Sequence, residues 1–389
     1  MNAGRIALSP AISNAYAEEL EKRLYFIAAE IERFKLVVEG ECITAIDLET
    51  PENEDLQALA AKINRVIAGE ITTQKLLPGK VVWQHDAHGD YDDTIFEQLC
   101  QRCWLTQAGE GQMAIGGPLI WLMDTLDEHV KAIATSLGAS EYRYPTLIPT
   151  KALEDCGYFD AFPHMLMFVT RLHNDVDIYQ KFAEQFKAAG GLGTFALNHC
   201  DNVDYCLPPT MCYHTYHQLR DQQLPGNQVI TAKGKSFRFE SKYHRTMERL
   251  WDFTIREIVF LGEKDFVIDC RHTYMQAAFA LMEKLGLTGY CEVASDPFFC
   301  SPDTAARIFS QKMRELKYEL RLNVAANRTI AVGSFNFHDQ TFGERFKITR
   351  SDQDWIRTGC VGFGLERLLY AFVCQHGLDE KRWQRVLAL

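Results

Sequence analysis

A cysteine, two glycines and an arginine stand close together in the stretch Thr358–Phe372, TGCVGFGLERLLYAF. Gly362 and Gly364 predict a sharp turn, because glycine adopts backbone conformations that other residues avoid. The residues after them predict a helix, whose free N–H groups and positive dipole end attract an anion. Arg367 in its first turns would add a planar cation that matches phosphate. A phosphate-binding turn is one interpretation, and an ordinary buried turn whose arginine pairs with a carboxylate is the other.

A second stretch, residues 236–262, predicts two antiparallel strands joined by a long polar loop. Side chains two positions apart share one face of a strand, so two arginines, an aromatic ring and two carboxylates would gather on one face of an extended hairpin. These five residues are Arg238, Glu240, Arg249, Phe253 and Glu257. Arginines can hold phosphates, the ring can stack on a base, and a carboxylate can hold an ammonium group or a metal. The alternative is a solvated face whose opposite charges pair with one another.

Cysteines and histidines are numerous, but few have the spacing of a metal site. Cys100 and Cys103 form one Cys-x-x-Cys pair without a second pair. Three further cysteines recur every six residues, which is no recognised ligand spacing: Cys200, Cys206 and Cys212. Each histidine taken singly is expected on the surface or as a satisfied core residue, including His164, His173, His214, His244 and His338.

The composition is that of a globular protein: 389 residues, 47% apolar and 24% charged, with room for more than one core. The net charge of −11 gives no general attraction for nucleic acid or an anionic membrane, which counts mildly against tRNA or DNA as a partner. No apolar run approaches the length of a membrane span, and the first residues show no secretory signal. Twelve cysteines then suggest free thiols or metal ligands in a reducing cytoplasm.

The pattern of apolar residues predicts two regions. Residues 1–84 are expected to form a small α+β extension without a chemical motif, with helices at 10–35 and 55–71 and a strand at 34–46. Residues 85–389 are expected to form the main domain, an α+β unit with a mainly antiparallel sheet. Its predicted helices cover 119–137, 179–189, 273–285 and 304–318, and its predicted strands cover 141–147, 236–240, 252–261 and 329–337.

The motifs taken together resemble a known family. The two stretches above resemble motifs 2 and 3 of class II aminoacyl-tRNA synthetases, and the helix 119–137 followed by EYRYPTLIP, with Pro145, resembles motif 1, the dimer element. At closer range, LPPTMCYHTYHQL, SFRFE, FTIREIVFLG, ASDPFF, KYEL, SFNFHDQTFG and TGCVGFGLERLLYAF resemble the amino acid:[carrier protein] ligases. Those enzymes are truncated relatives of the atypical, zinc-dependent seryl-tRNA synthetases of methanogens. The resemblance covers about residues 85–389 and implies a class II synthetase-like antiparallel sheet flanked by helices.

The resemblance assigns roles by position. A zinc ion would be held by Cys212, Glu257 and Cys360, a ligand set that also suits zinc chemically and leaves a fourth position for a substrate amine. The amino acid would be bound by Glu257, Ser334 and Asn336, and the catalytic arginines would be Arg238 and Arg367. ATP would contact Arg238, Glu240, Arg249, Leu250, Phe253, Lys317, Ala331, Val332, Gly333, Ser334 and Arg367. Magnesium would accompany ATP, although Ala331 stands where the seryl enzymes carry an acidic residue.

The expected function is ATP-dependent activation of a small amino acid, such as glycine or alanine, and its transfer to the phosphopantetheine thiol of a carrier protein. The alternative is a seryl-type enzyme that aminoacylates tRNA, and a third interpretation is a catalytically inactive relative with a binding role. The resemblance implies a homodimer. Carrier proteins are usually acidic, so docking is expected at a basic cluster, either Lys312, Arg314 and Arg321 or Lys381, Arg382 and Arg385.

Overall fold

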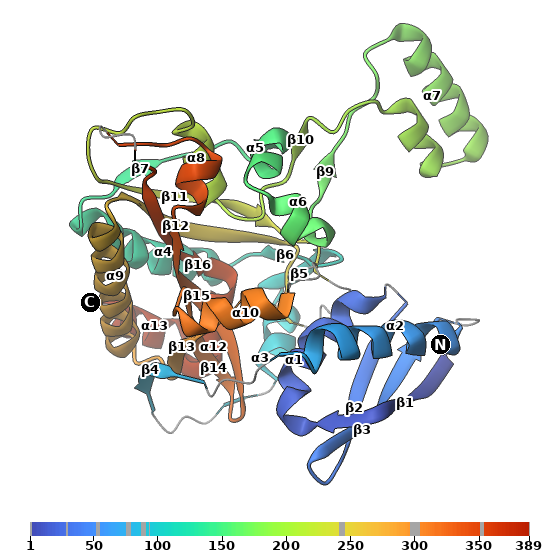
Figure 1. Ribbon diagram of the computed structural model, residues 1–389, viewed down its shortest axis with the longest axis horizontal. Coiled ribbons are helices and arrows are strands. Elements are labelled where there is room, and N and C mark those ends of the chain that lie inside the picture. The colour runs from blue at the N-terminus through green and yellow to red at the C-terminus, as the bar shows by residue number, and fades with distance from the viewer. Residues whose placement is uncertain are drawn as a thin grey trace.

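The computed structural model describes residues 2–28, 30–51, 55–74, 79–86, 91–92, 94–240, 246–295, 304–350 and 354–388. Its centre is an eight-stranded sheet with the strand order β4-β13-β14-β15-β16-β12-β11-β7 (Figure 1). Neighbouring strands run antiparallel except β11 and β7, which are parallel. The α+β prediction with a mainly antiparallel sheet is therefore confirmed. The strands are β4 Val81–His85, β7 Ser140–Tyr142, β11 Gln228–Phe237, β12 Asp252–Gly262, β13 Gly289–Val293, β14 Lys317–Ala325, β15 Arg328–Asp339 and β16 Arg357–Gly364.

The two faces of this sheet differ in what covers them. Three helices pack on one face: α4 Pro118–Ser136, α9 Lys264–Lys284 and α12 Leu365–His376. The helix α13 Glu380–Leu387 packs on α4. Ile258 and Phe260 of β12 point into this main core, as alternate positions of one strand should. The next positions, Val259 and Leu261, face the opposite side and belong to a second, smaller core.

The second face carries short elements around the smaller core. They are β8 Ile148–Pro149, α5 Thr150–Asp155, α6 Tyr158–Ala161, η3 Pro163–Met165, β9 Phe168–Val169, β10 Tyr205–Cys206, α8 Cys212–Gln218, α10 Thr304–Met313 and α11 Thr341–Arg345. The strands β8, β10 and β9 form a small sheet. Between β9 and β10 lie the helices α7 Val176–Ala189 and η4 Thr194–His199, and α7 projects away from the rest of the molecule (Figure 1). Elsewhere, α3 Ile95–Gln101 precedes a hairpin of β5 Leu105–Gly109 and β6 Gln112–Ile115.

The N-terminal region has its own sheet and its own core. Its elements are β1 Asn2–Ser13, η1 Asn14–Tyr16, α1 Ala17–Ile27, β2 Arg33–Glu39, β3 Cys42–Thr50, α2 Leu56–Val66 and the π-helical turn η2 Ile67–Ile71. Leu20 and Leu24 of α1 pack against Ile43 and Ile46 of β3. The expected boundary after residue 84 falls inside β4, because β4 pairs with β13 of the main sheet from Val81 onward.

Several predicted elements have different limits in the structure. The predicted helix 10–35 begins only at Ala17, because residues 2–13 pair as a strand with β3. The predicted strand 141–147 is reduced to β7, and the predicted helix 304–318 ends at Met313, before β14. The strand expected at 236–240 stops at Phe237. No helix in the described part of the chain is both long and apolar enough to cross a membrane.

Candidate functional site

A cavity of about 640 Å³ lies over the second face of the sheet. All but one of the residues expected to bind ATP, the amino acid or zinc line it. They are Cys212, Arg238, Glu240, Leu250, Phe253, Glu257, Lys317, Ala331, Val332, Gly333, Ser334, Asn336, Cys360 and Arg367. Arg249 is the exception, although its Nη1 donates a hydrogen bond of 2.9 Å to Glu240 in the lining. The structure thus brings together residues that are up to 155 positions apart, from Cys212 to Arg367.

The register of three neighbouring strands explains how this happens. Gly362 of β16 stands opposite Glu257 of β12 on one side and opposite Ser334 of β15 on the other. Two positions earlier on β16, Cys360 stands opposite Asn336. A Cβ atom on Gly362 would lie 3.3 Å from Glu257 Oε1, tighter than most real contacts, so the glycine leaves room for this carboxylate.

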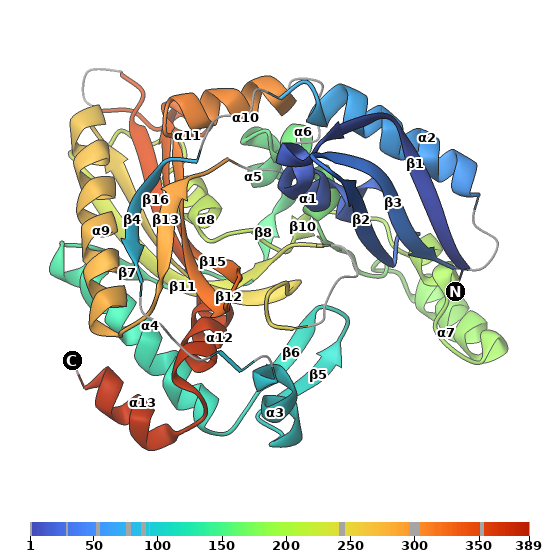
Figure 2. The same ribbon diagram turned by 90° about the horizontal axis from the view of Figure 1, so that it is seen from below.

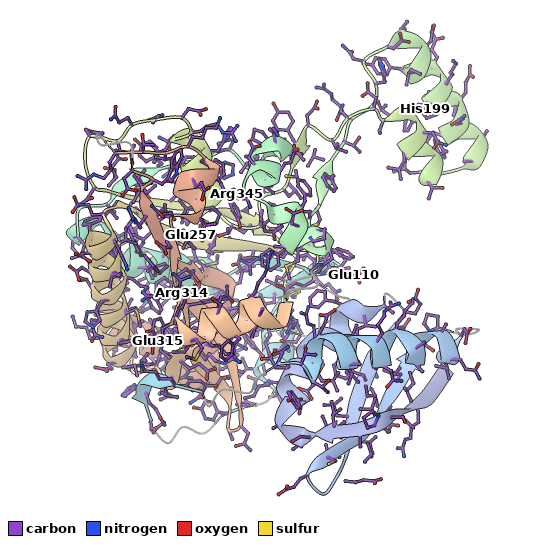
Figure 3. All side chains as sticks on the ribbon, in the orientation of Figure 1. Glu110, His199, Glu257, Arg314, Glu315 and Arg345 are labelled. Carbon is purple, nitrogen blue, oxygen red and sulfur yellow. The ribbon has the colours of Figure 1, made fainter. Side chains whose placement is uncertain are left out.

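Cys212, Glu257 and Cys360 form one compact cluster at one end of the cavity. Their ligand atoms all lie within 4.8 Å of one another, and all three side chains are buried. The Glu257 carboxylate accepts hydrogen bonds from the Thr210 hydroxyl and from the backbone N–H of Cys212, the first residue of α8. Asn336 Nδ2 donates to Cys360 Sγ over 3.4 Å. The cluster is therefore held in place by α8 and the residues just before it as well as by the sheet. Figure 3 shows Glu257 inside the main body of the molecule.

The electrostatics of this cluster are unfavourable for three free anions. Burial raises the pKa of the Cys212 thiol well above its ordinary value, and the Cys360 and Glu257 anions beside it act in the same direction. A hydrogen bond from Cys212 lowers the pKa of Cys360. Burial and the Cys360 sulfur raise the pKa of Glu257 to about 8. Like charges in an apolar place cannot all ionise unless a cation joins them.

A zinc ion fits this donor set. Two thiolates and a carboxylate are ordinary zinc ligands, and three protein ligands leave one coordination position open. The outer contacts also fit, because Thr210 and Asn336 orient the ligand atoms by hydrogen bonds. No lysine or arginine of the described residues forms an ion pair with Glu257, so the negative charge of the cluster is left for an ion from outside.

The other end of the cavity carries positive charge in excess. The side chain of Glu240 is 3% exposed, and its carboxylate is surrounded by three arginines: Arg238, Arg249 and Arg367. Burial opposes ionisation of Glu240, but the three arginines outweigh it and hold its pKa below the ordinary value. The guanidinium of Arg238 lies 5.4 Å from the centre of the Phe253 ring. An aromatic ring beside clustered arginines can receive a base and its phosphates.

Backbone contacts hold these arginines in place. Arg238 Nε donates to the carbonyl of Pro209 over 3.1 Å, and Arg367 Nη1 donates to the carbonyl of Ala331 over 3.3 Å. The chain around Arg249 is a turn before β12, so Arg249 does not share a strand face with Phe253 as predicted. It reaches the site through Glu240 instead. Lys317 pairs with Glu319 over 3.1 Å on β14.

Several lining residues were not predicted, among them Thr210, Glu366, His338 and Arg345. Thr210 precedes Cys212 by two positions, and Glu366 accepts the N–H of Thr254 at 2.7–2.8 Å. His338 lies with its Nε2 3.8 Å from Cys360 Sγ, and Arg345 is exposed at the cavity edge. His338 is the one that sequence could have revealed. In SFNFH it alternates with Phe335 and Phe337 and so shares a face with Ser334 and Asn336.

The other cysteines do not form a site. Within the described residues, the cluster above is the single group of three or more potential metal ligands. Cys100 is half-buried against the main core and Cys103 is exposed. Cys200 and Cys206 donate to the backbone carbonyls of Ala196 and Ile148, so only Cys212 of the six-residue series is a candidate ligand.

The first basic cluster expected to dock a carrier is neutralised within the chain. Lys312 lies near Glu19, Arg314 pairs with Asp339, and Arg321 pairs with Glu319. Each of these cations lies beside a carboxylate of the same chain, and docking of a carrier at this cluster stays a prediction. The second cluster, Lys381, Arg382 and Arg385, is exposed on α13.

The fold and the relatives identify the family. The sequence matches no protein-family model. It is 34% identical over 268 residues to amino acid–[acyl-carrier-protein] ligase 1 of Bradyrhizobium diazoefficiens, which covers 67% of this chain and 80% of that protein. The chain belongs to the amino acid–[acyl-carrier-protein] ligase family. Another member, ligase 2 of the same organism, is 32% identical over 247 residues. The chain is accordingly a ligase.

The ligase family shares its fold with seryl enzymes. The chain is 26% identical over 325 residues to the type-2 serine–tRNA ligase of Methanococcus aeolicus, and the match covers 80% of this chain but 62% of that relative. The solved structure of M. kandleri SerRS in complex with A. aeolicus tRNASec superposes with a TM-score of 0.72 at 22% identity, over 91% of this chain and 72% of that one. The cytoplasmic serine–tRNA ligase of Naegleria fowleri superposes with a TM-score of 0.60 at 11% identity, over 85% of this chain and 70% of that one. The class II synthetase fold expected from the sequence is thus confirmed.

Proposed function

We propose that this ligase activates a small amino acid with ATP as an aminoacyl-adenylate and transfers it to the phosphopantetheine thiol of a carrier protein. One observation carries the proposal: a single cavity joins an anionic thiolate–carboxylate cluster to a cluster of three arginines. The first matches a metal-bound amine and the second matches a triphosphate. Two relatives, both named amino acid–[acyl-carrier-protein] ligases, support the carrier as acceptor.

Cys212, Glu257 and Cys360 would hold zinc at the amino-acid end. When bound, zinc supplies an open coordination position for the neutral amino group of the substrate. Ser334 and Asn336 stand beside Cys360 on the neighbouring strand and would contact the rest of the amino acid. The amino group is then fixed at one end and the carboxylate is directed toward the arginines.

The arginines would bind ATP at the other end. Arg238 would contact the α-phosphate and the substrate carboxylate, Arg367 the terminal phosphate, and Phe253 the adenine ring. Lys317, Leu250 and the strand segment 331–334 would complete the nucleotide site, and magnesium would accompany the phosphates. Glu240 and Arg249 hold one another and help to fix the adenine end.

The chemistry then needs positioning and charge more than a dedicated base. A carboxylate oxygen of the amino acid attacks the α-phosphorus of ATP, the bond to the bridging oxygen breaks, and pyrophosphate leaves. Arg238 and Arg367 stabilise the negative charge that develops on the phosphate oxygens. In the second step the thiol sulfur attacks the carbonyl carbon of the adenylate, AMP leaves with the oxygen, and the thiol proton passes to solvent.

Transfer to tRNA is the second candidate. The type-2 serine–tRNA ligase relatives favour it, since they match a larger share of this chain than the carrier ligase does, 80% against 67%. The net charge of −11 favours the carrier instead.

The organisation of the protein is part of the proposal. The protein would have a catalytic domain and a separate N-terminal unit, as the sequence predicts. The boundary between them would lie at about residue 80 rather than after residue 84, because β4 belongs to the main sheet. A homodimer would use the motif 1 region, where Ile120 and Trp121 of α4 and Tyr142 of the edge strand β7 are exposed apolar side chains. The carrier would dock near Lys381, Arg382 and Arg385 of α13, which are exposed cations.

Exchange of labelled pyrophosphate into ATP tests the activation step. The purified protein should support exchange with glycine, alanine or another small amino acid, and a zinc chelator should abolish it. Re-addition of zinc should restore the rate. Absence of exchange with all twenty amino acids in the zinc-loaded protein would contradict the proposal and favour a non-catalytic binding role.

A further inference from the structure

The N-terminal unit contacts the main body through one side of α1. Positions 19, 23 and 26 follow one another at helical spacing and share a face, whereas Leu20 and Leu24 point into the core of the unit. Near the start of the helix, Glu19 Oε1 lies 3.8 Å from Lys312 Nζ of α10. Near its end, the Phe26 ring meets the His164 ring edge-on, with 5.2 Å between their centres. Figure 2 shows α10 running along the edge of the main body toward the N-terminal unit.

Both segments that α1 contacts also line the substrate cavity. The helix α10 presents Arg307, Ser310 and Gln311 to it, at positions that share one face. Met165 follows His164 directly and lines the cavity too. Its carbonyl accepts the N–H of Phe239, a hydrogen bond of 3.0 Å between the site hairpin and the same wall.

The helix α10 packs through a buried side chain on the neighbouring helix α6. Its buried residue Ile308 packs with Ala161 and Phe162 in a cluster of its own, apart from the main core. Lys312 stands four positions after Ile308 and points along the same side of the helix, toward Glu19. The turn η2 also packs beside α10 and is tied to α1 by an ion pair of 2.9 Å between Glu70 and Arg23. The N-terminal unit and α6 therefore both pack against α10.

We propose that the N-terminal unit positions one wall of the substrate cavity, through the ion pair of Glu19 with Lys312 and the ring contact of Phe26 with His164. The role rests on the proposed function, because the wall encloses the site assigned to ATP and the amino acid. None of these four side chains lines the cavity. They are positioning residues, and their effect falls on substrate binding, seen in KM, more than on the rate of the bound complex, seen in kcat.

A charge-swap series tests this role. Glu19→Lys should raise the KM for ATP in pyrophosphate exchange about fivefold, with kcat changed less than twofold. Lys312→Glu should do the same, and the double variant Glu19→Lys/Lys312→Glu should recover most of the lost affinity. Lys62→Glu is the matched control, since Lys62 is exposed on α2 of the same unit and should leave KM unchanged. If the reversed charge of Glu19→Lys prevents folding, Glu19→Gln replaces it in the test, with a smaller rise expected in the KM for ATP.

Calorimetric titration of ATP separates this role from the proposed function. The dissociation constant of ATP should rise with KM in the single variants and recover in the double variant. Unchanged ATP affinity in both single variants, or a double variant no better than either, would overturn the positioning role while leaving the function intact. If the zinc-loaded parent protein lacks exchange but the titration shows the expected series, the proposed function fails and the positioning role stands.

Discussion

Arg256 and Glu257 are neighbours on β12, both are almost fully buried, and they point to opposite faces of the sheet. The charge of Arg256 is paired within the chain. Asp127 of α4 accepts hydrogen bonds from its Nε and, over 2.9 Å, from its Nη2, and Glu141 lies 3.3 Å from its Nη1. Glu257 lies beside two cysteines and accepts two hydrogen bonds, and it forms no ion pair with a lysine or arginine among the described residues.

The difference teaches how to distinguish a structural charge from a functional one. Burying a charge is costly, so a charge that serves the fold is paired within the chain. On the face of the sheet that carries Arg256, each named charge has a partner of opposite sign, since Asp127 also pairs with Lys233 and Glu141 pairs with Lys131. The Glu257 side keeps a surplus of negative charge, and the arginine cluster across the cavity keeps a surplus of positive charge. Surplus charge in a cavity indicates ligands, and the ligands that we propose here are zinc and ATP.

The largest effect on activity is expected from substitutions in the cluster of Cys212, Glu257 and Cys360. Cys360→Ala or Glu257→Gln should remove bound zinc and lower pyrophosphate exchange about 1000-fold, corresponding to roughly 4 kcal/mol of transition-state stabilisation. Unfolding of the zinc-free variants should differ little from that of the zinc-free parent, because an unpaired buried charge has been removed. Zinc content by atomic emission and exchange rates check this. Cys291→Ala, a buried cysteine of β13 outside the site, should keep its zinc.

The opposite pattern is expected on the Arg256 side. Asp127→Ala leaves a buried guanidinium without its main partner and should lower the free energy of unfolding by about 3–5 kcal/mol. The folded fraction should still bind one zinc ion. Asp124→Ala is the matched control, since Asp124 is exposed on the same helix and should change stability by less than about 1 kcal/mol. Urea unfolding measures both. Equal losses in the two variants would remove the structural role assigned to the buried pair.

Acid pH should destabilise the Arg256 side as well. Burial alone would raise the pKa of Asp127, but Arg256 and Lys233 outweigh it and hold that pKa below its ordinary value. A carboxylate with a lowered pKa adds stability above its unfolded pKa, near 4, and loses it as pH falls through the folded pKa. Urea unfolding between about pH 6 and pH 2 should therefore show a steeper acid decline for the parent than for Asp127→Asn. Parallel curves would contradict the assignment.

The smallest effect is expected on zinc affinity, from a substitution of the glycine beside Glu257. Gly362→Ala places a Cβ atom 3.1 Å from Ile255 Cδ1 and 3.3 Å from Glu257 Oε1, which should shift the carboxylate and weaken zinc binding about tenfold. Gly364→Ala is the control, because its Cβ would meet no atom within 4 Å. Competition with a chromogenic zinc chelator measures both. Similar affinities in the two variants would mean that Gly362 has no part in seating Glu257.

Much of this arrangement could be predicted from alternation along strands. The period of two places Phe253 and Glu257 on one face of β12, and the glycine-rich stretch does form a strand that leads into a helix at Gly364. What alternation cannot predict is which strands lie side by side. The meeting of Cys360 with Glu257 depends on β16 lying between β12 and β15, a long-range pairing without a local signal. The motif resemblance, and not the spacing, joined these residues beforehand.

The failures also have physical causes. Residues 2–13 were not predicted as a strand because the pairing with β3 is what stabilises it, with Ile6, Leu8 and Ile12 buried in the N-terminal core. Arg249 was assigned to a strand face, but its ion pair with Glu240 holds it in a turn. The sequence could not show that Lys312 and Arg314 lie beside carboxylates far away in the chain. In each case a tertiary contact overrode the local pattern.

Transfer of the activated amino acid tests the central claim most directly. The zinc-loaded protein would be incubated with ATP, magnesium and a labelled small amino acid, together with a phosphopantetheinylated acyl carrier protein, its apo form, or bulk tRNA. The account predicts a thioester on the phosphopantetheinylated carrier, seen as the mass of one added aminoacyl group, and none on the apo carrier or on tRNA. Aminoacylated tRNA together with an unmodified carrier would contradict it.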